Sequence, residues 1–308
     1  MKPSNHILVI RFSAMGDVAM TVPVLQRLVK TYPNLKVTVL TKPFFQPIVE
    51  EVPGVNVITA DVKQKYKGIL GLWKLAKELK ALEIDEVADL HNVLRTKILR
   101  FFLFFFGIHA AVINKGRAEK KELTKLQFKT IKPLKSTHQR YADVFAKLGL
   151  PIDLNLSLPQ KKHPLPQVIK SELKHPRKWI GIAPFAAHEP KMYPLSKMEK
   201  VIAELDKTNQ YDILLFGGGK KEKQQLEKLA TNYKNVCSLV GKLSFKEELQ
   251  PLSNLDAMVS MDSGNAHLAA IFGVPVISIW GATHPYAGFA PFQQKSEQQI
   301  LPDLKKYP

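Results

Sequence analysis

The sequence predicts an α/β protein made of two domains, each built on a doubly wound parallel sheet. Short apolar runs alternate with segments of helical periodicity along all 308 residues, and this alternation is typical of parallel sheets. A chain of this length can form about two separate cores. Prolines and lysines without periodicity over Leu158–Pro166 indicate the linker. We therefore predict domains at residues 1–158 and 159–308.

The strands expected in the first domain are short, apolar and rich in β-branched residues. They are Ile7–Phe12, Lys36–Thr41, Val55–Ala60, Glu86–Leu90 and Ala111–Asn114. Helices are expected between them, one from about Val18, one over Gly71–Leu82 with an apolar core-facing side, and a last one over Tyr141–Leu148.

The second domain repeats the pattern without a repeat in sequence. Its expected strands are Trp179–Pro184, Asp212–Phe216, Asn235–Val240, Ala257–Met261 and Val274–Trp280. A glycine turn, Gly217–Gly219, precedes a helix expected over Lys221–Ala230; it either admits a nucleotide or is simply a tight turn. The chain lacks the Gly-x-Gly-x-x-Gly fingerprint and the Walker lysine pattern, which argues against a dinucleotide dehydrogenase or a P-loop enzyme.

The charge of the chain points to an anionic partner. There are 45 Lys and Arg against 27 Asp and Glu, a net charge of +18. This favours a nucleic acid, a phospholipid surface or a phosphorylated glycolipid as partner, with a merely solvated surface as the alternative. The basic residues are dispersed and no nucleic-acid-binding motif is present, so we expect no nucleic-acid partner. The single cysteine, Cys237, excludes an internal disulfide framework and a Cys-rich metal site.

The most apolar stretch, Ile98–Ile108, contains Arg100 and is too short to cross a bilayer. It includes Phe101–Phe106 beside a basic flank. It could seat the protein on an anionic membrane, but we favour a core helix packed on the sheet. Because Met1–Asn5 leads directly into the first strand, we expect no secretory signal.

Two strand-to-helix junctions carry the candidate chemistry. The strand ending at Met261 breaks on Asp262–Gly264 and turns into a helix of small residues. A helix N-terminus offers free N–H groups and a positive dipole end, which suit a phosphate. The second junction places Asp17 after the first strand, where ligands gather in open sheets.

Four stretches resemble the heptosyltransferase family of lipopolysaccharide core assembly, in the family's order and over nearly the whole chain. They are Ile7–Val18, Pro190–Pro194, Asp262–His267 and Pro275–Gly281. The resemblance implies the GT-B architecture, in which two Rossmann-like domains face a cleft, the first binding the acceptor and the second the nucleotide sugar.

The resemblance also implies a function. The protein is expected to transfer a heptose from an ADP-activated donor, ADP-heptose, to the lipid A inner core, inverting the anomeric centre without metal or other cofactor. An anionic glycolipid acceptor and peripheral contact with the cytoplasmic face of the inner membrane follow from this. Two departures from the family are the absence of hydroxyl residues over Pro184–His188 and the early end of the chain at Pro308.

By the same resemblance Asp17 is the general base, with an N-cap for the following helix as the alternative role. Lys191 is expected to neutralise phosphate. Glu222 should accept from ribose hydroxyls or else lie on a solvated helix face.

At the second junction Asp262 should bind sugar hydroxyls, and Ser263 and Gly264 the diphosphate. His267 either donates to a phosphate oxygen or packs beneath the sheet. The expected acceptor-binding residues are basic and lie in the first domain: Arg95, Arg117, Lys120, His138 and Arg140.

A sugar-nucleotide epimerase of similar fold and a noncatalytic nucleotide-sugar-binding protein remain alternatives. An epimerase converts the nucleotide sugar alone, whereas a transferase releases nucleotide only when an acceptor is present.

Overall fold

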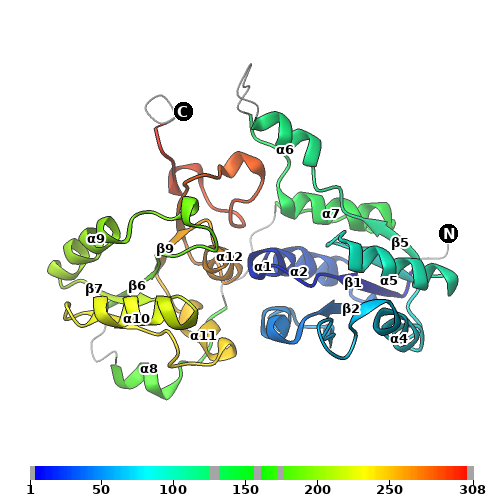
Figure 1. Ribbon diagram of the computed structural model, residues 1–308, viewed down its shortest axis with the longest axis horizontal. Coiled ribbons are helices and arrows are strands. Elements are labelled where there is room, and N and C mark those ends of the chain that lie inside the picture. Colours follow the sequence, from blue (N-terminus) through cyan, green and yellow to red (C-terminus); the bar gives the residue numbers. More distant parts are fainter. Residues whose placement is uncertain (1–3, 125–131, 156–160, 173–176, 304–308) are drawn as a thin grey trace. The chain divides into compact units, whose positions relative to one another are not determined.

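The computed structural model describes residues 4–124, 132–155, 161–172 and 177–303, and the chain divides into two compact units (Figure 1). The first unit comprises residues 1–130 and 134–157, and the second comprises residues 131–133 and 158–308. Both are α/β units with an entirely parallel sheet, which is the fold class that the sequence predicts. Within the predicted linker, residues 158–160 lie outside the described part of the chain.

The sheet of the first unit has the strand order β3-β2-β1-β4-β5. Its strands are β1 (His6–Ile10), β2 (Lys36–Thr41), β3 (Val55–Thr59), β4 (Glu86–Asp89) and β5 (His109–Val112). Its helices are α1 (Met15–Ala19), α2 (Thr21–Thr31), α3 (Gln46–Val49), α4 (Gly68–Lys80), α5 (Leu94–Phe105), α6 (Arg117–Leu123) and α7 (Thr137–Lys147), with a 3-10 turn η1 (Pro43–Phe45).

The strand β1 is buried on both faces, so it reads as a continuous apolar run. Alternate residues point to opposite faces. Leu8 and Ile10 join the core cluster that contains Leu75 of α4 and Leu99 and Leu103 of α5. The helices α4 and α5 therefore cover one face of the sheet, while α2 and α7 contact each other away from them.

The second unit has the strand order β11-β10-β9-β6-β7-β8. Its strands are β6 (Lys178–Ala183), β7 (Tyr211–Leu215), β8 (Val236–Ser238), β9 (Ala257–Met261), β10 (Val276–Ile279) and β11 (Gln299–Ile300). Its helices are α8 (Gln167–Glu172), α9 (Leu195–Lys207), α10 (Gly219–Ala230), α11 (Phe245–Leu252) and α12 (Gly264–Ile271), with 3-10 turns η2 (Glu189–Lys191), η3 (Pro285–Ala287) and η4 (Ser296–Gln298).

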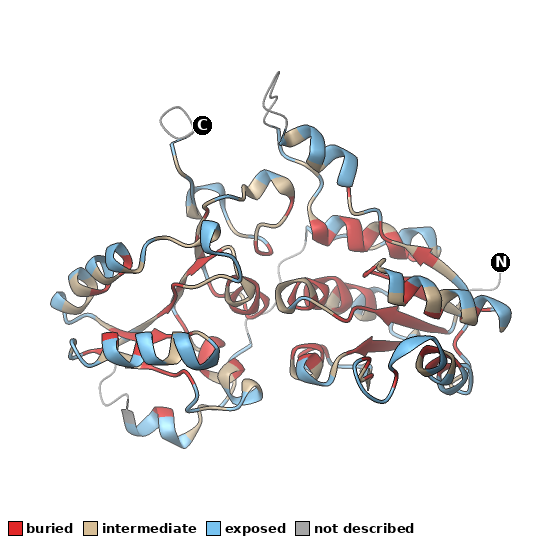
Figure 2. Cartoon of the chain, viewed as in Figure 1, coloured by how far each residue is buried: buried red, intermediate tan, exposed pale blue. Residues whose placement is uncertain are grey.

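The core of this unit lies between the sheet and the helices α9 and α10. Met198 and Ile202 of α9 and Leu226 of α10 pack against Ile213 and Leu215 of β7. The outward sides of these two helices are lined with lysine and glutamate, and Figure 2 shows them largely in the colour of exposed residues. This is the amphipathic pattern of surface helices.

The phenylalanine-rich helix differs from the core helix that the sequence favours. Thr96, Leu99 and Leu103 of α5 are buried, so one side of the helix packs on the sheet. The other side of the helix is exposed. Phe101 and Phe105 are 57% and 65% exposed. The helix is therefore buried on one side only and leaves aromatic rings exposed on the other.

Candidate active site

Each sheet has a point where the strand order reverses, between β1 and β4 in the first unit and between β6 and β9 in the second. Loops that leave two neighbouring strands in opposite directions open a crevice at their carboxyl ends, where ligands bind. Asp17 and His91 follow β1 and β4. Lys191 and Asp262 follow β6 and β9. Each unit thus has its candidate residues at its own switch point.

The carboxylate of Asp17 is held through one of its oxygens. Oδ2 forms an ion pair with the Arg11 guanidinium at 2.6 Å and accepts the Ala14 N–H at 3.1 Å. The Tyr141 hydroxyl donates to the Asp17 carbonyl at 3.2 Å. Within the described residues Oδ1 accepts no hydrogen bond, and the side chain is 31% exposed. The carboxylate is therefore oriented through Oδ2, and Oδ1 is left for a ligand.

The helix expected from Val18 begins earlier, at Met15, so Asp17 lies in its first turn and Ala14 is the N-cap residue. The reason is that the Asp17 carboxylate reaches back to the Ala14 N–H and satisfies a donor at the start of the helix. Asp17 therefore has a capping bond without being the N-cap, and that bond uses only the oxygen that also binds Arg11.

His91 stands beside Asp17 as a neutral, buried imidazole. Its Nδ1 accepts the Phe12 N–H and its Nε2 lies near the Ser13 hydroxyl, each at 3.4 Å. Burial, followed by the positive charges of Arg11 and Lys115, lowers the pKa of His91 to about 3. Since Nδ1 accepts, Nε2 carries the proton. His91 therefore ties the end of β4 to the loop after β1, which ends in Asp17.

Two lysines that the sequence did not single out also lie near this edge. Burial and the positive charge of Arg11 lower the pKa of Lys115, and the charge of Asp17 opposes that shift. Burial and nearby positive charges, Arg95 among them, lower the pKa of Lys42. Lys42 directly follows β2, and Lys115 lies three residues after β5. A position just after a strand end is the sequence signal that could have identified them.

The helix α6 carries two of the predicted acceptor residues, Arg117 and Lys120. Arg117 is exposed, and its positive charge lowers the pKa of Lys115. Burial, followed by the positive charge of Arg140, lowers the pKa of Lys120 to about 8, and the charge of Asp17 acts in the opposite direction. Lys120 is therefore close enough to Asp17 for the two charges to interact.

Arg140 and His138 of α7 are both buried, each 4% exposed. The Arg140 guanidinium donates to Glu119 at 2.7 Å, and it also donates to the carbonyl oxygens of Lys135 and Asn114. These bonds hold α6 against α7. The structure thus gives Arg140 a scaffolding role, and its predicted contact with an acceptor stays a prediction, as does that of His138.

In the second unit Lys191 and Asp262 form one cluster. The Lys191 Nζ lies 2.6 Å from Asp262 Oδ2, and the Thr283 hydroxyl donates to the same oxygen at 2.7 Å. The Asp262 side chain is 8% exposed and that of Lys191 is 26% exposed. The Pro190 carbonyl accepts the Ala282 N–H at 2.9 Å, which fixes the η2 turn to the segment after β10. Thr283 was not identified from the sequence because it lies far along the chain from both partners.

Ser263 is the N-cap of α12, but its hydroxyl lies 3.0 Å from Ser260 and makes no bond to the first turn. The first N–H groups of Gly264 and its neighbours are therefore not occupied by the cap side chain, which suits an anion. His267 is 7% exposed, as expected for a residue packed under the sheet edge.

Glu222 lies in the first turn of α10, and its Oε2 accepts the Gly218 N–H at 2.7 Å. The carboxylate thus closes the glycine turn at the end of β7. It faces the loop rather than standing on the solvated side of the helix among the lysines that surround it in the sequence.

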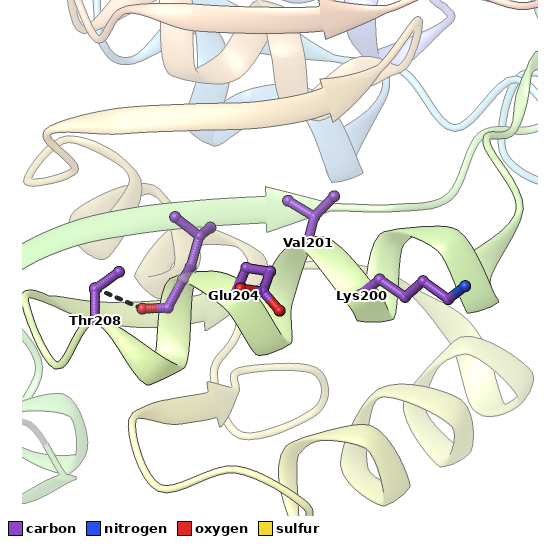
Figure 3. A pocket seen from close by; sticks show the side chains of 5 residues that line it. Lys200, Val201, Glu204 and Thr208 are labelled. Atoms are coloured by element: carbon purple, nitrogen blue, oxygen red, sulfur yellow. Dashed lines mark hydrogen bonds between the residues drawn. The ribbon is translucent and has the colours of Figure 1, made fainter.

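A shallow hollow lies elsewhere, on the outer side of α9 (Figure 3). Lys200, Val201, Glu204, Leu205 and Thr208 line it, and the Thr208 hydroxyl donates to the Leu205 carbonyl at 2.7 Å. The hollow contains none of the site residues and lies along a single helix, so it is no candidate for the donor site.

The described residues contain no group of three or more His, Cys, Asp or Glu side chains placed to hold a metal ion. Over the same part of the chain, every helix is too short or too polar to span a bilayer.

Curated heptosyltransferases resemble this chain over most of its length. The lipopolysaccharide core heptosyltransferase OpsX of Haemophilus influenzae is 25% identical over 288 residues, 91% of this chain and 80% of that protein. The lipooligosaccharide heptosyltransferase 2 of the same species is 27% identical over 301 residues, covering 91% and 84%.

Solved structures share the fold. A glycosyl transferase family 9 structure from Veillonella parvula has a TM-score of 0.76 at 21% identity, covering 97% of this chain and 86% of that one. The E. coli heptosyltransferase WaaC with ADP has a TM-score of 0.70 at 21% identity, covering 96% and 92%. WaaC and E. coli heptosyltransferase II confirm the predicted two-domain fold class.

The family model described as glycosyltransferase family 9 (heptosyltransferase) matches residues 72–308, well over half of the chain. That match favours a transferase over the epimerase and the noncatalytic binder. The matched residues include the second unit with Lys191 and Asp262, and α6 with its basic residues. The chain therefore belongs to glycosyltransferase family 9, the heptosyltransferases, and is a glycosyltransferase.

Proposed function

We propose that this protein transfers a heptose from ADP-heptose to the inner core of lipid A in lipopolysaccharide, by an inverting reaction that needs no metal. The observation that carries the proposal is the state of Asp17. One carboxylate oxygen is held by Arg11 and the Ala14 N–H, and the other is left for an acceptor hydroxyl. A base held in this way can remove the hydroxyl proton as the glycosidic bond forms.

In the second unit, Lys191 and the N-terminus of α12 receive the negative charge of the departing ADP. Lys191 is paired with Asp262, and the two residues follow the strands on either side of the switch point. Ser263 and the Gly264 N–H bind the diphosphate, and Asp262 binds sugar hydroxyls. Positive groups that are already in place where negative charge develops lower the activation barrier, because they do not have to reorient during the reaction.

Glu222 takes the ribose hydroxyls in this proposal. Its carboxylate already accepts a backbone N–H at the glycine turn, so it is positioned beside the loop where a nucleoside would approach. His267 supports the same site from below. A buried imidazole one turn into α12 can hold the helix start in place or donate to a phosphate oxygen.

The acceptor is an anionic glycolipid bound at the carboxyl edge of the first unit. Lys42 and Arg95 lie on the β2 and β4 side, and Lys115, Arg117 and Lys120 lie on the β5 side. Lysine and arginine so placed suit phosphates and acidic sugars. The protein works as a peripheral protein at the cytoplasmic face of the inner membrane, where such an acceptor is assembled.

The test is the release of ADP from ADP-heptose, with and without a lipopolysaccharide acceptor that lacks core heptose. We expect release only with the acceptor, together with a product heavier by one heptose, and equal rates in EDTA. Conversion of ADP-heptose without acceptor would identify an epimerase. Donor binding without turnover on an acceptor used by a control transferase would identify a noncatalytic binder. Loss of rate in EDTA that magnesium restores would contradict metal independence.

A further inference from the structure

The outer side of α5 carries a stripe of exposed apolar side chains, which Lys97 interrupts. Leu94, Phe101, Phe104 and Phe105 are 74%, 57%, 59% and 65% exposed. At about 100° per residue these four positions fall within one sector of the helix, opposite the buried Leu99 side. The stripe is therefore one face of the helix, about 16 Å long.

The neighbouring helix α4 extends this surface. Ile69 and Leu70 at its start are 63% and 83% exposed. Trp73 of α4 packs edge-on against Phe102 of α5, with ring centroids 5.1 Å apart. From Phe102 the ring contacts continue through Phe101 and Phe105 to Phe104. The two helices thus form one aromatic surface, which we call the α4–α5 face.

Basic side chains lie along this face, together with an acidic one. Lys77 lies over the Trp73 ring at 5.2 Å, and Lys80 lies over the Phe106 ring at 4.6 Å. Lys74 and Lys97 are also exposed. Lysines that extend over aromatic rings place their charges at the rim of an apolar surface.

The acidic residue is Glu78 of α4. Its carboxylate accepts the Tyr66 hydroxyl at 2.5 Å and pairs with Lys65 at 3.6 Å, so its charge is compensated. Arg100 takes no part in the face because it pairs with Asp89 beneath the helix at 2.9 Å.

We propose that the α4–α5 face is the surface by which this protein docks on an anionic lipid bilayer. Phenylalanines insert at the boundary between headgroups and acyl chains, and lysines at the rim bind anionic headgroups. The charge of the rim favours a bilayer over a second copy of the chain, since two such faces would bring lysines together. Exposed apolar patches of this kind mark interaction surfaces.

The position of the face also fits a lipid-linked acceptor. The helix α5 begins shortly after β4, with Arg95 in its first turn, and runs away from the carboxyl edge of the sheet. If α5 is docked on the bilayer, the carboxyl edge of the first unit's sheet lies near the lipid headgroups. In this respect the inference rests on the proposed function, but the docking itself is tested without donor, acceptor or turnover.

The experiment measures the partition of the full chain onto sedimented vesicles of phosphatidylglycerol and phosphatidylcholine, and onto vesicles of phosphatidylcholine alone. We expect binding to the anionic vesicles that weakens with salt, and little binding to the others. The combined variant Phe101→Ser, Phe104→Ser, Phe105→Ser should lose at least tenfold in partition, because each phenylalanine contributes apolar burial. Lys74→Gln and Lys97→Gln should each lose about fivefold on the anionic vesicles.

The matched control is Phe44→Ser. Phe44 is 58% exposed, as the stripe residues are, but it lies in η1 and not on the α4–α5 face. It should partition as the unsubstituted protein does. Anionic-vesicle binding that the triple variant retains in full would overturn the proposal. So would a wild-type dimer that the triple variant dissociates while neither binds vesicles, because the face would then join two copies.

A second measurement covers the case in which the triple variant misfolds. In a Trp73→Phe background, which removes the native indole of this face, Phe104→Trp and Phe44→Trp each add one indole to the first unit, while Trp179 and Trp280 of the second unit are common to both variants. Lipids with brominated acyl chains should quench the first and leave the second unchanged. Equal quenching of the two variants would contradict insertion of this face.

Discussion

At the residue scale, the first unit is organised by a few side chains around Asp17. Arg11 is the central one, because its guanidinium binds the Asp17 carboxylate at 2.6 Å and the Leu90 carbonyl at 2.6 Å. It also lies over the Tyr141 ring at 5.8 Å. A buried cation with these partners fixes the Asp17 carboxylate and joins β1, β4 and α7 in one network.

Asp17→Asn should separate catalysis from structure. Asn can still cap the Ala14 N–H but cannot accept a proton. We expect transfer to fall by about a hundredfold to ten-thousandfold, with donor affinity unchanged by calorimetry. The variant should also unfold more easily, by about 1–3 kcal/mol, because Arg11 loses its charged partner. Turnover at the wild-type rate would show that Asp17 is only a capping residue.

Asp262→Asn should weaken the donor site. Lys191 then loses its ion pair, and Thr283 donates to a neutral oxygen. We expect donor affinity to fall by about tenfold or more, and Thr283→Val to cost about fivefold, the value of one hydrogen bond. Lys207→Ala is the matched control, because Lys207 forms a surface pair with Glu204 on α9. Calorimetry should show weaker donor binding for Asp262→Asn and Thr283→Val, and wild-type donor binding for Lys207→Ala. Equal donor affinity in all three variants would mean that the donor binds elsewhere.

Lys120 should make acceptor binding depend on pH. Its pKa is lowered to about 8, so a growing fraction becomes neutral as the pH rises through that value. An anionic acceptor needs the charged form. The KM for acceptor should therefore rise between pH 7 and 9, while kcat is less affected. In Lys120→Arg the side chain stays charged, and the rise should disappear. A rise of the same size in both enzymes would remove Lys120 from the acceptor site.

At the scale of elements, the packing of α6 on α7 depends on a buried guanidinium. The Gly116 residue before α6 has φ of 62°, and a Cβ there would collide with the Arg140 side chain. Glycine is needed at this position both for its backbone conformation and for the close approach of Arg140. This contact sets the start of α6, which carries the predicted acceptor residues Arg117 and Lys120.

Arg140→Met should destabilise the first unit by about 2–4 kcal/mol, because Glu119 and two carbonyl oxygens lose their donor. Arg117→Met, on the exposed N-terminal turn of α6, should melt as the wild type does. Thermal unfolding of the two variants measures the difference. Identical melting temperatures would mean that Arg140 contributes binding and not structure.

At the scale of the whole molecule, stability should depend on pH through the imidazole of His91. Its pKa is about 3 in the folded protein and near 6.5 when unfolded. Between these values the unfolded chain binds a proton that the folded chain does not, so stability falls as the pH drops. We expect this residue to contribute a loss of about 2 kcal/mol between pH 6.5 and 4.5.

His91→Gln is the matching variant, because Gln can accept the Phe12 N–H and donate to Ser13 without titrating. Its free energy of unfolding should change less over the same interval when denaturant titrations are compared. Parallel pH curves for the two proteins would contradict the assignment.

The sequence by itself determined much of this protein. Alternating apolar runs and amphipathic helices specify two parallel sheets, and Asp17, Lys191 and Asp262 follow strands whose order places them at switch points. Local chemistry is sufficient for these predictions, since periodicity and turn residues act over a few positions. Strand ends remained inexact: β1 ends at Ile10, two residues before the predicted end, because the Phe12 N–H turns to His91.

Only the tertiary structure decided which side chains meet. The contacts Arg11–Leu90, Arg140–Glu119 and Thr283–Asp262 join residues far apart in the chain, and no local pattern encodes them. Burial is decided in the same way. Arg140 looks like an exposed ligand-binding group in the sequence, but the structure shows that it is buried and bonded to Glu119 and two carbonyl oxygens. The phenylalanines of α5 look like core residues, yet the helix has only one side to bury, so the others remain exposed.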